Sequence, residues 1–320
     1  MRIVVYGTGA IGGTVAAALT HAGQPVTAIA RGAQLDAIRA HGLRLRSPEQ
    51  DFTVALDVVD SPQAARIGAG DAILLAMKGQ HTDMALEALR AAGVTDQPIF
   101  CLQNGVANER RALRLFPNVH GVTVMMPVAF RRPGEVISYS KPQFGVFDIG
   151  RAVGGHDAAD IALAEAVTAG NIAGYVSDSV MASKYGKLLL NLNNIVGAAF
   201  GPDADTGALK ARARAEAEAV LTAAGIAWQD VGVSDARRVK HMSMSDVPGV
   251  EPFGSSTAQS LERGTGSVET DWLNGEIVLL GRLHGVATPV NAWLTGLAAR
   301  LARQGAAPGS VPLSDVPALG

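Results

Sequence analysis

The chain has 320 residues, of which 48% are hydrophobic and 18% charged, and its formal net charge at pH 7 is −2. This length and apolar content allow large buried cores in two domains. The near-neutral charge, without a Lys/Arg-rich run, argues against nucleic acid as a partner. No apolar run reaches the ~18 residues that span a bilayer, so we expect no membrane partner either.

The single cysteine, Cys101, lies in an apolar run of strand length. One cysteine excludes an intrachain disulfide, and this fits a reducing compartment. We therefore expect a soluble, cytoplasmic protein in which Cys101 is a core thiol, and we expect no metal site.

The first 31 residues predict a βαβ unit that binds a dinucleotide. Residues 2–6 (RIVVY) have the composition of a buried strand, residues 15–19 that of a helix and residues 26–30 that of a second strand. A G-x-G-x-x-G turn joins the first strand to the helix, as in dinucleotide-binding domains. The alternative is a tight turn without a ligand. The predicted binding residues are Gly7, Thr8, Gly9, Ala10, Ile11 and Gly12.

Each glycine of this turn has its own physical role. Gly7 permits the tight turn, Gly9 lets the backbone approach a pyrophosphate, and Gly12 allows the helix to pack closely on the strand. The N–H groups and the positive dipole end of the helix then face the phosphates.

Arg31 stands at the end of the second strand, where an NAD site usually has an acidic residue that binds the ribose hydroxyls. The nearest acid is Asp36. A guanidinium suits a 2′-phosphate, because its planar fork donates two hydrogen bonds to the dianion. We therefore expect NADP (NADPH) rather than NAD, the alternative being a solvated surface arginine.

Lys78 and Asn104 follow two further predicted strands, residues 71–77 and 98–103. Strand ends of this kind meet the cofactor in an open α/β sheet. Lys78 is thus predicted to contact cofactor phosphate or ribose, unless it is a solvated lysine. Asn104 is predicted to hold nicotinamide or substrate, although Asn-Gly is also an ordinary turn sequence.

The remaining pattern predicts an α/β fold: a doubly wound sheet over residues 1–178, an all-α domain over residues 179–305, and a mobile Pro- and Gly-rich tail over residues 306–320. In the first domain we also expect a helix at 33–41, two short strands within 43–59, helices at 82–92 and 158–169, and strands at 119–130, 135–139, 144–149 and 173–177. In the second we expect helices at 179–200, 205–224, 234–241, 255–263, 268–285 and 291–304.

The helix predicted at 179–200 carries Lys187, Asn191 and Asn194 among leucines. Lys187 and Asn191 are one turn apart and share a face, and Asn194 lies near the same stripe. Buried unpaired, these groups would be costly. Either they line a polar cleft or they satisfy one another and nearby backbone.

Two further groups of polar residues permit two interpretations. Glu269 begins the helix predicted at 268–285, where a carboxylate stabilises the helix dipole; alternatively, it faces Lys187 across a cleft. Ser255, Ser256 and Thr257 either cap a helix or contact a carboxylate substrate.

Taken together, these motifs resemble the ketopantoate reductase (2-dehydropantoate 2-reductase) family, up to about Arg303. The matching stretches are residues 7–12, Arg31-Gly32, Lys78, Gln103-Asn104-Gly105, Lys187-Leu188 with Asn191, Ser256 before Leu261-Glu-Arg-Gly264, Glu269 to Gly275, and His284 to Asn291.

The resemblance implies a Rossmann-type NADP-binding domain, a helical substrate and catalytic domain, and NADPH-dependent reduction of a small 2-oxo acid. Lys187 would be the general acid that protonates the carbonyl oxygen, and Glu269 would orient it and bind the substrate hydroxyl. Asn104 and Asn191 would position nicotinamide and substrate, Ser256 would meet the carboxylate, and Arg31 and Lys78 would hold NADPH.

Two departures from the family pattern lie on the substrate side. Ile195 stands where the family has a second substrate asparagine, and Asn194 is one residue early, about 100° around a helix. One extra residue also precedes Glu269. An alternative on the same scaffold is therefore reduction of another 2-oxo acid or an imine. An alternative from another class is a non-catalytic NADPH-sensing or partner-binding protein. Apolar helices such as 268–285 offer a surface for a homodimer.

Overall fold

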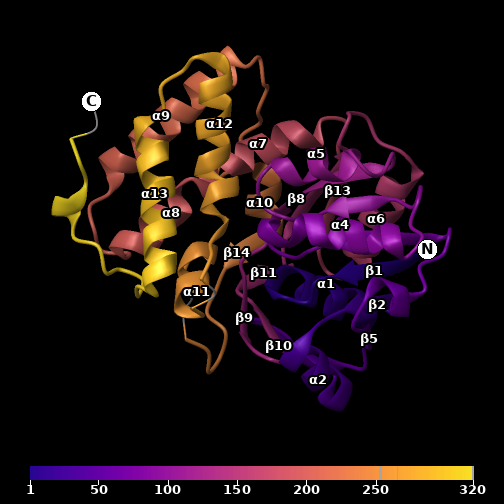
Figure 1. The fold of residues 1–320 in the computed structure, drawn as a ribbon. Coiled ribbons are helices and arrows are strands. Elements are labelled where there is room, and N and C mark those ends of the chain that lie inside the picture. The colour runs from indigo at the N-terminus through magenta and orange to yellow at the C-terminus, as the bar shows by residue number, and fades with distance from the viewer. Residues whose placement is uncertain (252–253, 265, 319–320) are drawn as a thin grey trace. The chain divides into compact units, whose positions relative to one another are not determined.

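The structure, a computed structural model, describes residues 1–251, 254–264 and 266–318 (Figure 1). It divides into two compact units. Unit 1 comprises Met1–Gln103, Asn108–Ser183 and Val231–Glu251, and unit 2 comprises Asn104–Ala107, Lys184–Asp230 and Pro252–Gly320. Relative to the boundary expected at residue 178, three segments differ: 104–107 belong to unit 2, and 179–183 and 231–251 belong to unit 1.

Unit 1 is built on an eight-stranded sheet of order β13-β12-β8-β7-β6-β1-β2-β5. All neighbouring strands are parallel except β8 and β12, which pair antiparallel. In that order the strands are Ala173–Val176, Val146–Arg151, Val119–Met125, Ile99–Cys101, Asp71–Leu75, Arg2–Tyr6, Val26–Ile29 and Asp57–Val59. The predicted fold class is confirmed.

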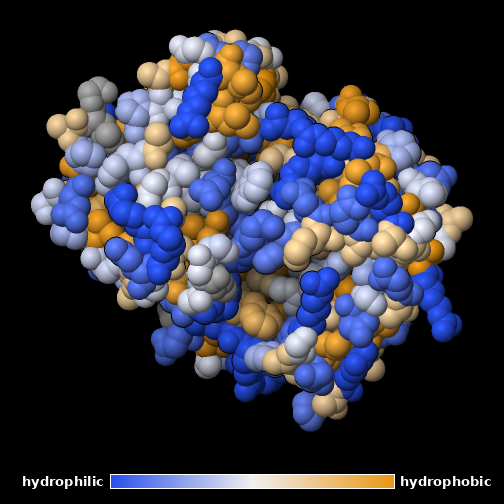
Figure 2. All heavy atoms as spheres, in the orientation of Figure 1, coloured by the Kyte–Doolittle hydropathy of each residue, from blue (hydrophilic) through white to orange (hydrophobic). Residues whose placement is uncertain are grey.

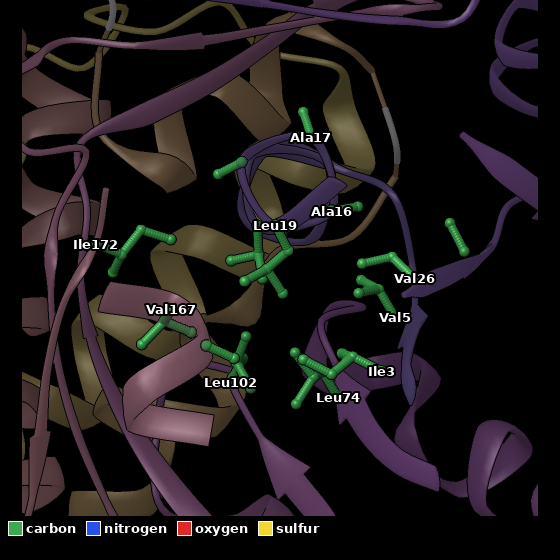
Figure 3. Close-up of a cluster of buried hydrophobic side chains, with 14 of the residues drawn as sticks. Ile3, Val5, Ala16, Ala17, Leu19, Val26, Leu74, Leu102, Val167 and Ile172 are labelled. Carbon is green, nitrogen blue, oxygen red and sulfur yellow. The ribbon is translucent and has the colours of Figure 1, made fainter. Parts of the chain in front are cut away.

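Both faces of this sheet are buried, which explains its near-continuous apolar strands. On one face, Ile3 and Val5 of β1 pack against Leu19 of α1 (Ala10–His21), as Figure 3 shows. On the other, Val4 packs with Leu86 of α4 (Thr82–Ala91). The remaining helical segments of unit 1 are α2 (Gly32–His41), α3 (Pro62–Ala65), η1 (Gly79–His81), α5 (Ala107–Leu113), α6 (Ala158–Ala169) and α10 (Ala236–His241).

A second sheet, of order β4-β3-β10-β9, packs against α1. Its strands are Asp51–Val54, Leu43–Arg46, Glu135–Ser138 and Val128–Arg132. The single strand predicted at 119–130 is wrong: β8 ends before Pro127, and the chain then enters the second sheet as β9. Likewise, residues 43–59 form three strands rather than two, since β5 joins the large sheet.

The segment 231–251 contains a strand that the sequence does not predict. β14 (Met242–Met244) pairs antiparallel with β11 (Ser140–Pro142). Nearby, the Arg237 guanidinium donates to the Asp148 carboxylate, which is only 4% exposed. A three-residue strand has no periodicity to detect, so its existence depends on this tertiary pairing.

Unit 2 is helical, with α8, α9, α11, α12 and α13 at Asn193–Phe200, Gly207–Ala223, Ser256–Glu262, Asn274–His284 and Pro289–Gln304. α7 (Val180–Asn191) begins in unit 1 and continues into unit 2. Two predicted long helices are wrong. The helix at 179–200 is interrupted at Leu192, and the one at 268–285 starts as the 3-10 turn η2 (Glu269–Trp272).

The segment after α13 contacts α8. Gly309 N–H donates to the Ala198 carbonyl at 2.8 Å, Val311 N–H donates to the Ala199 carbonyl at 3.0 Å, and Val311 also packs on the helical core. The sequence predicts a mobile tail from its Pro and Gly content. In the structure the glycine serves a turn, since Gly309 has φ +74°, and the following residues are hydrogen-bonded.

The surface of α12 carries two exposed leucines one turn apart, Leu279 (44% exposed) and Leu283 (67%). In Figure 2 an apolar area lies over part of α12. This is the helix for which the sequence predicts a dimer surface, and dimerisation stays a prediction. Among the helices that the structure describes, none has the length and apolar character needed to cross a bilayer.

Candidate active site

The glycine turn after β1 has the geometry that its sequence predicts. Gly7 has φ +100°, and a Cβ there would lie 2.8 Å from the backbone nitrogen of Met77. A Cβ on Gly12 would lie 1.9 Å from the Gly7 carbonyl oxygen. Around Gly9, in contrast, a Cβ would meet nothing within 4 Å. The backbone at Gly9 is therefore open to a ligand, whereas Gly7 and Gly12 are required by packing.

A cavity of about 410 Å³ adjoins this turn within unit 1. Three of the predicted turn residues and Arg31 line it, whereas Ala10, Ile11 and Gly12 form the first turn of α1 beneath. None of the described residues that line it is acidic. The described residues that line it are Tyr6, Gly7, Thr8, Gly9, Ile29, Ala30, Arg31, Gln34, Met77, His81, Met84, Ala85 and Phe130.

The polar groups of the cavity are fixed by hydrogen bonds. The Arg31 guanidinium donates to the Tyr6 hydroxyl at 3.2 Å. Gln34 donates to the Thr8 carbonyl at 2.9 Å and accepts from Gly134 N–H at 2.7 Å, so it ties the glycine turn to the hairpin of the second sheet. Burial raises the pKa of Tyr6, and the nearby charge of Arg31 opposes this. The composition fits a dinucleotide phosphate: open backbone, a guanidinium and no carboxylate.

The structure places the other two predicted cofactor residues as follows. Lys78 is half-buried and directly follows Met77. Its carbonyl accepts a hydrogen bond from His81 N–H at 2.9 Å. Met77 and His81 both line the cavity. Asn104 belongs to unit 2, where the next residue, Gly105 (φ +80°), packs on the Trp272 carbonyl. A Cβ on Gly105 would lie 2.8 Å from that oxygen.

In unit 2, α7 carries Lys187 and Asn191. The lysine is half-buried, while Leu188 and Leu189 beside it are buried in the core. Asn191 is 8% exposed, and its Nδ2 finds no hydrogen-bond partner among the residues that the structure describes. A buried donor left unpaired costs about 1–3 kcal/mol, so it is more typical of a ligand site than of a core.

Gly186 was not predicted to matter, yet it fixes the position of α7. A Cβ there would lie 1.7 Å from the carbonyl oxygen of Gln229. Any larger residue would push α7 away from this backbone and displace Lys187, the next residue in the chain. A glycine inside a predicted helix is the sequence signal that could have identified it.

Asn194 follows the interruption of the helix at Leu192 and contacts the start of α11. The Asn194 amide donates to the Ser256 hydroxyl at 3.3 Å, and the Ser255 hydroxyl donates to the Asn194 carbonyl at 2.9 Å. Ile195 is 1% exposed and packs in the helical core. Ser256 and Asn194, both predicted site residues, are thus brought together.

Glu269 lies half-buried in the first turn of η2 rather than in a regular α-helix. The extra residue noted before it falls near Thr265, which lies outside the described residues. Behind η2, Asn274 and Asn291 are fully buried. Asn274 donates to Asn291 at 3.0 Å and to the Leu192 carbonyl at 3.3 Å. These two asparagines of the matched stretches therefore support the backbone of the site.

One cluster of potential metal ligands occurs among the described residues: His120, Asp157 and Asp160 in unit 1. Hydrogen bonds already occupy them. His120 Nδ1 pairs with Asp160 at 2.7 Å, and both carboxylates cap the N-terminus of α6. The arrangement is explained by helix capping.

Comparisons with known proteins agree with this architecture. Residues 3–151 match the family described as ketopantoate reductase PanE/ApbA, and residues 179–302 match its C-terminal domain. A 2-dehydropantoate 2-reductase from Mesorhizobium japonicum is 28% identical, covering 94% of this chain and 98% of the relative. One from Pyrococcus horikoshii is 26% identical, with 93% and 96% covered.

Two solved structures extend the comparison. A ketopantoate reductase of this family from Ralstonia eutropha JMP134 has a TM-score of 0.79 at 28% identity, covering 95% of this chain and 99% of that one. A D-mandelate dehydrogenase with NADH and anilino(oxo)acetate also has a TM-score of 0.79, at 23% identity and the same coverage. The second likeness concerns the fold alone.

The doubly wound sheet, its open glycine turn and the adjoining cavity define a dinucleotide-binding domain of the Rossmann type. With the relatives above, they assign the class: an NAD(P)-dependent oxidoreductase acting on CH–OH groups. Both domains of the chain match one family within this class. The chain belongs to the ketopantoate reductase family.

Proposed function

We propose that the protein uses NADPH to reduce 2-dehydropantoate to pantoate, with Lys187 as the general acid. The observation that carries this proposal is on α7. A half-buried lysine is followed one turn later by Asn191, whose buried amide nitrogen is unpaired among the described residues. A proton donor beside a free hydrogen-bond donor suits a carbonyl substrate.

Lys187 of α7 can stabilise negative charge on a carbonyl oxygen and donate a proton to it. Bound NADPH supplies a hydride to the carbonyl carbon. As negative charge develops on the oxygen, the Lys187 ammonium stabilises it and then donates its proton, which yields the hydroxyl group of the product. Glu269 is proposed to orient Lys187 and bind a substrate hydroxyl, and Asn104 and Asn191 to position nicotinamide and substrate.

The choice of NADPH depends on Arg31. None of the described residues that line the cavity is acidic, so a guanidinium just after β2 favours a 2′-phosphate over a free 2′-hydroxyl. Thr8 and Gly9 would present backbone N–H groups at the start of α1 to the pyrophosphate. Lys78 is proposed to contact phosphate or ribose from the end of β6.

The substrate carboxylate is assigned to the pair Ser256 and Asn194. Their hydrogen bond of 3.3 Å places a hydroxyl and an amide side by side at the start of α11. Asn194 thereby takes the role that the family pattern gives to the following position, which Ile195 fills with a core side chain.

The experiment that tests this function is a panel of acceptors assayed with NADPH. Purified protein is mixed with 2-dehydropantoate, with straight-chain, branched and aromatic 2-oxo acids, and with an imine, and the loss of NADPH absorbance is followed. We expect the highest kcat/KM for 2-dehydropantoate. Higher activity with another acceptor would assign the scaffold to that substrate, and no turnover with any would favour a sensing or partner-binding protein.

A further inference from the structure

Tyr6 ends β1, and Arg31, the N-cap residue of α2, lies two residues after the end of β2; both line the cofactor cavity. In the parallel register of β1 and β2, Tyr6 is opposite Ile29, the last residue of β2, and Arg31 follows two residues later. The Arg31 guanidinium donates to the Tyr6 oxygen at 3.2 Å, and both residues line the cavity. The end of β1 and the start of α2 thus present a phenol and a guanidinium to the same space.

The Tyr6 hydroxyl can still donate a hydrogen bond. Its oxygen accepts from Arg31, but a phenol can accept and donate at once. Among the described residues, no acceptor for its proton is found. Tyr6 is only 5% exposed, and burial raises its pKa, so the proton is retained at neutral pH. A buried O–H at a cavity wall, next to a guanidinium, is a donor for an anionic oxygen.

We propose that Tyr6 is a specificity-determining residue for the cofactor, because its hydroxyl donates to the 2′-phosphate that Arg31 binds. The inference rests on the proposed use of NADPH. Tyr6 acts in two ways. It adds a second donor to the phosphate, and it holds the exposed Arg31 side chain in place, which reduces the ordering cost of binding. A neutral 2′-hydroxyl gains less, since charge-assisted hydrogen bonds are about twice as strong.

The test is the substitution Tyr6→Phe, which removes only the hydroxyl. Dissociation constants for NADP⁺ and NAD⁺ are measured by calorimetry. We expect the Kd of NADP⁺ to rise about five- to twentyfold and that of NAD⁺ less than about twofold. The matched control is Tyr139→Phe, another buried tyrosine of unit 1, whose hydroxyl donates to the Glu251 carbonyl at 3.0 Å. It should leave both constants unchanged.

Three outcomes distinguish a failure of the proposed role of Tyr6 from a failure of the proposed use of NADPH. Wild-type protein that binds NAD⁺ as tightly as NADP⁺ would overturn the proposed cofactor and, with it, the role of Tyr6. A wild-type preference for NADP⁺ that survives Tyr6→Phe would overturn the role of Tyr6 alone. Equal weakening of both cofactors would also overturn it, because that is the pattern of a general structural effect.

A second set of variants makes the test independent of the stability of Tyr6→Phe. Arg31→Lys keeps the charge but loses the planar fork that reaches phosphate and Tyr6 together, so we expect the preference for NADP⁺ to fall about tenfold or more. In an Arg31→Ala background, Tyr6→Phe should have less effect on NADP⁺ than in the wild type. Independent effects of the two substitutions would contradict the proposal that Tyr6 and Arg31 bind the 2′-phosphate together.

Discussion

Asn274 Nδ2 lies 3.3 Å from the carbonyl oxygen of Leu192, the residue that separates α7 from α8. A side chain that enters a helical hydrogen-bond ladder is a known cause of local distortion. Here the distortion has a use, because Asn191 precedes it and Asn194 follows it. Asn274 of α12 thus supports the backbone between these two predicted substrate residues.

Asn274→Ala tests this relationship. The Leu192 carbonyl and Asn291 would both lose a donor in a buried setting, so the free energy of unfolding should fall by about 2–4 kcal/mol. Urea unfolding measures this. Arg282→Ala, an exposed change on the same helix, is the control and should stay within about 0.5 kcal/mol of wild type. A loss no larger than that of the control would mean that Asn274 does not support the interruption.

Lys187→Ala tests the general acid. Without the proton donor, kcat should fall about 10²- to 10⁴-fold, while the Kd of NADPH stays close to that of wild type. Steady-state kinetics and cofactor titration give the two values. Lys187→Arg is the matched variant, because it keeps the positive charge but holds its proton too strongly to donate it. Full activity in either variant would show that Lys187 has another role.

Substitutions at positions 194 and 195 should have different effects, the first on substrate binding and the second on stability. Asn194→Ala should raise the KM for the 2-oxo acid about tenfold or more through loss of one charge-assisted contact, with little change in Tm. Ile195→Asn should instead lower the stability by about 2–4 kcal/mol, because it buries an amide in the helical core. Thermal unfolding and kinetics on both variants decide this. Tighter substrate binding by Ile195→Asn would contradict the assignment of Asn194.

The lowered pKa of Asp71 predicts that the stability of the fold depends on pH. Burial alone would raise its pKa, but the Arg2 side chain, which donates from Nε at 3.0 Å, and Gly68 N–H outweigh burial, so the pKa is lowered. The carboxylate therefore stabilises the fold above its unfolded pKa of about 3.9, and this contribution is lost as the pH falls through the lower folded value.

Asp71→Asn should accordingly cost about 1–2 kcal/mol at neutral pH. Unfolding by urea at neutral and at strongly acidic pH should show the difference from wild type shrinking below about pH 4. Asp36→Asn, at an exposed position of α2, serves as the control. A difference that stays constant over this range would argue that Asp71 acts through packing rather than charge.

The sequence was sufficient for the βαβ unit and most strands, because buried parallel strands are continuous apolar runs and glycine turns have fixed spacing. It was insufficient where structure depends on distant partners. β14 exists because β11 offers an edge to pair with, and the break at Leu192 depends on Asn274, 82 residues later. The contact of the Asn194 amide with Ser256, 62 residues later, likewise depends on the tertiary fold.

Tyr6 was missed for a different reason. At the end of an apolar strand it looks like any other core residue, and only the register with β2 brings its hydroxyl to Arg31. Had that register been assumed, the position two residues before Arg31 in the pairing would have identified it. The polar end of an otherwise apolar strand is the signal to examine.

The return of residues 231–251 to unit 1 has a consequence for dissecting the protein. A fragment ending at residue 183 would keep both sheets, but it would leave the Asp148 carboxylate buried without Arg237 and the β11 edge without β14. An uncompensated buried charge destabilises a fold, and an open strand edge recruits other chains. The nucleotide-binding half is thus completed by chain synthesised after much of unit 2, so excising it at the apparent domain border should give an aggregation-prone product.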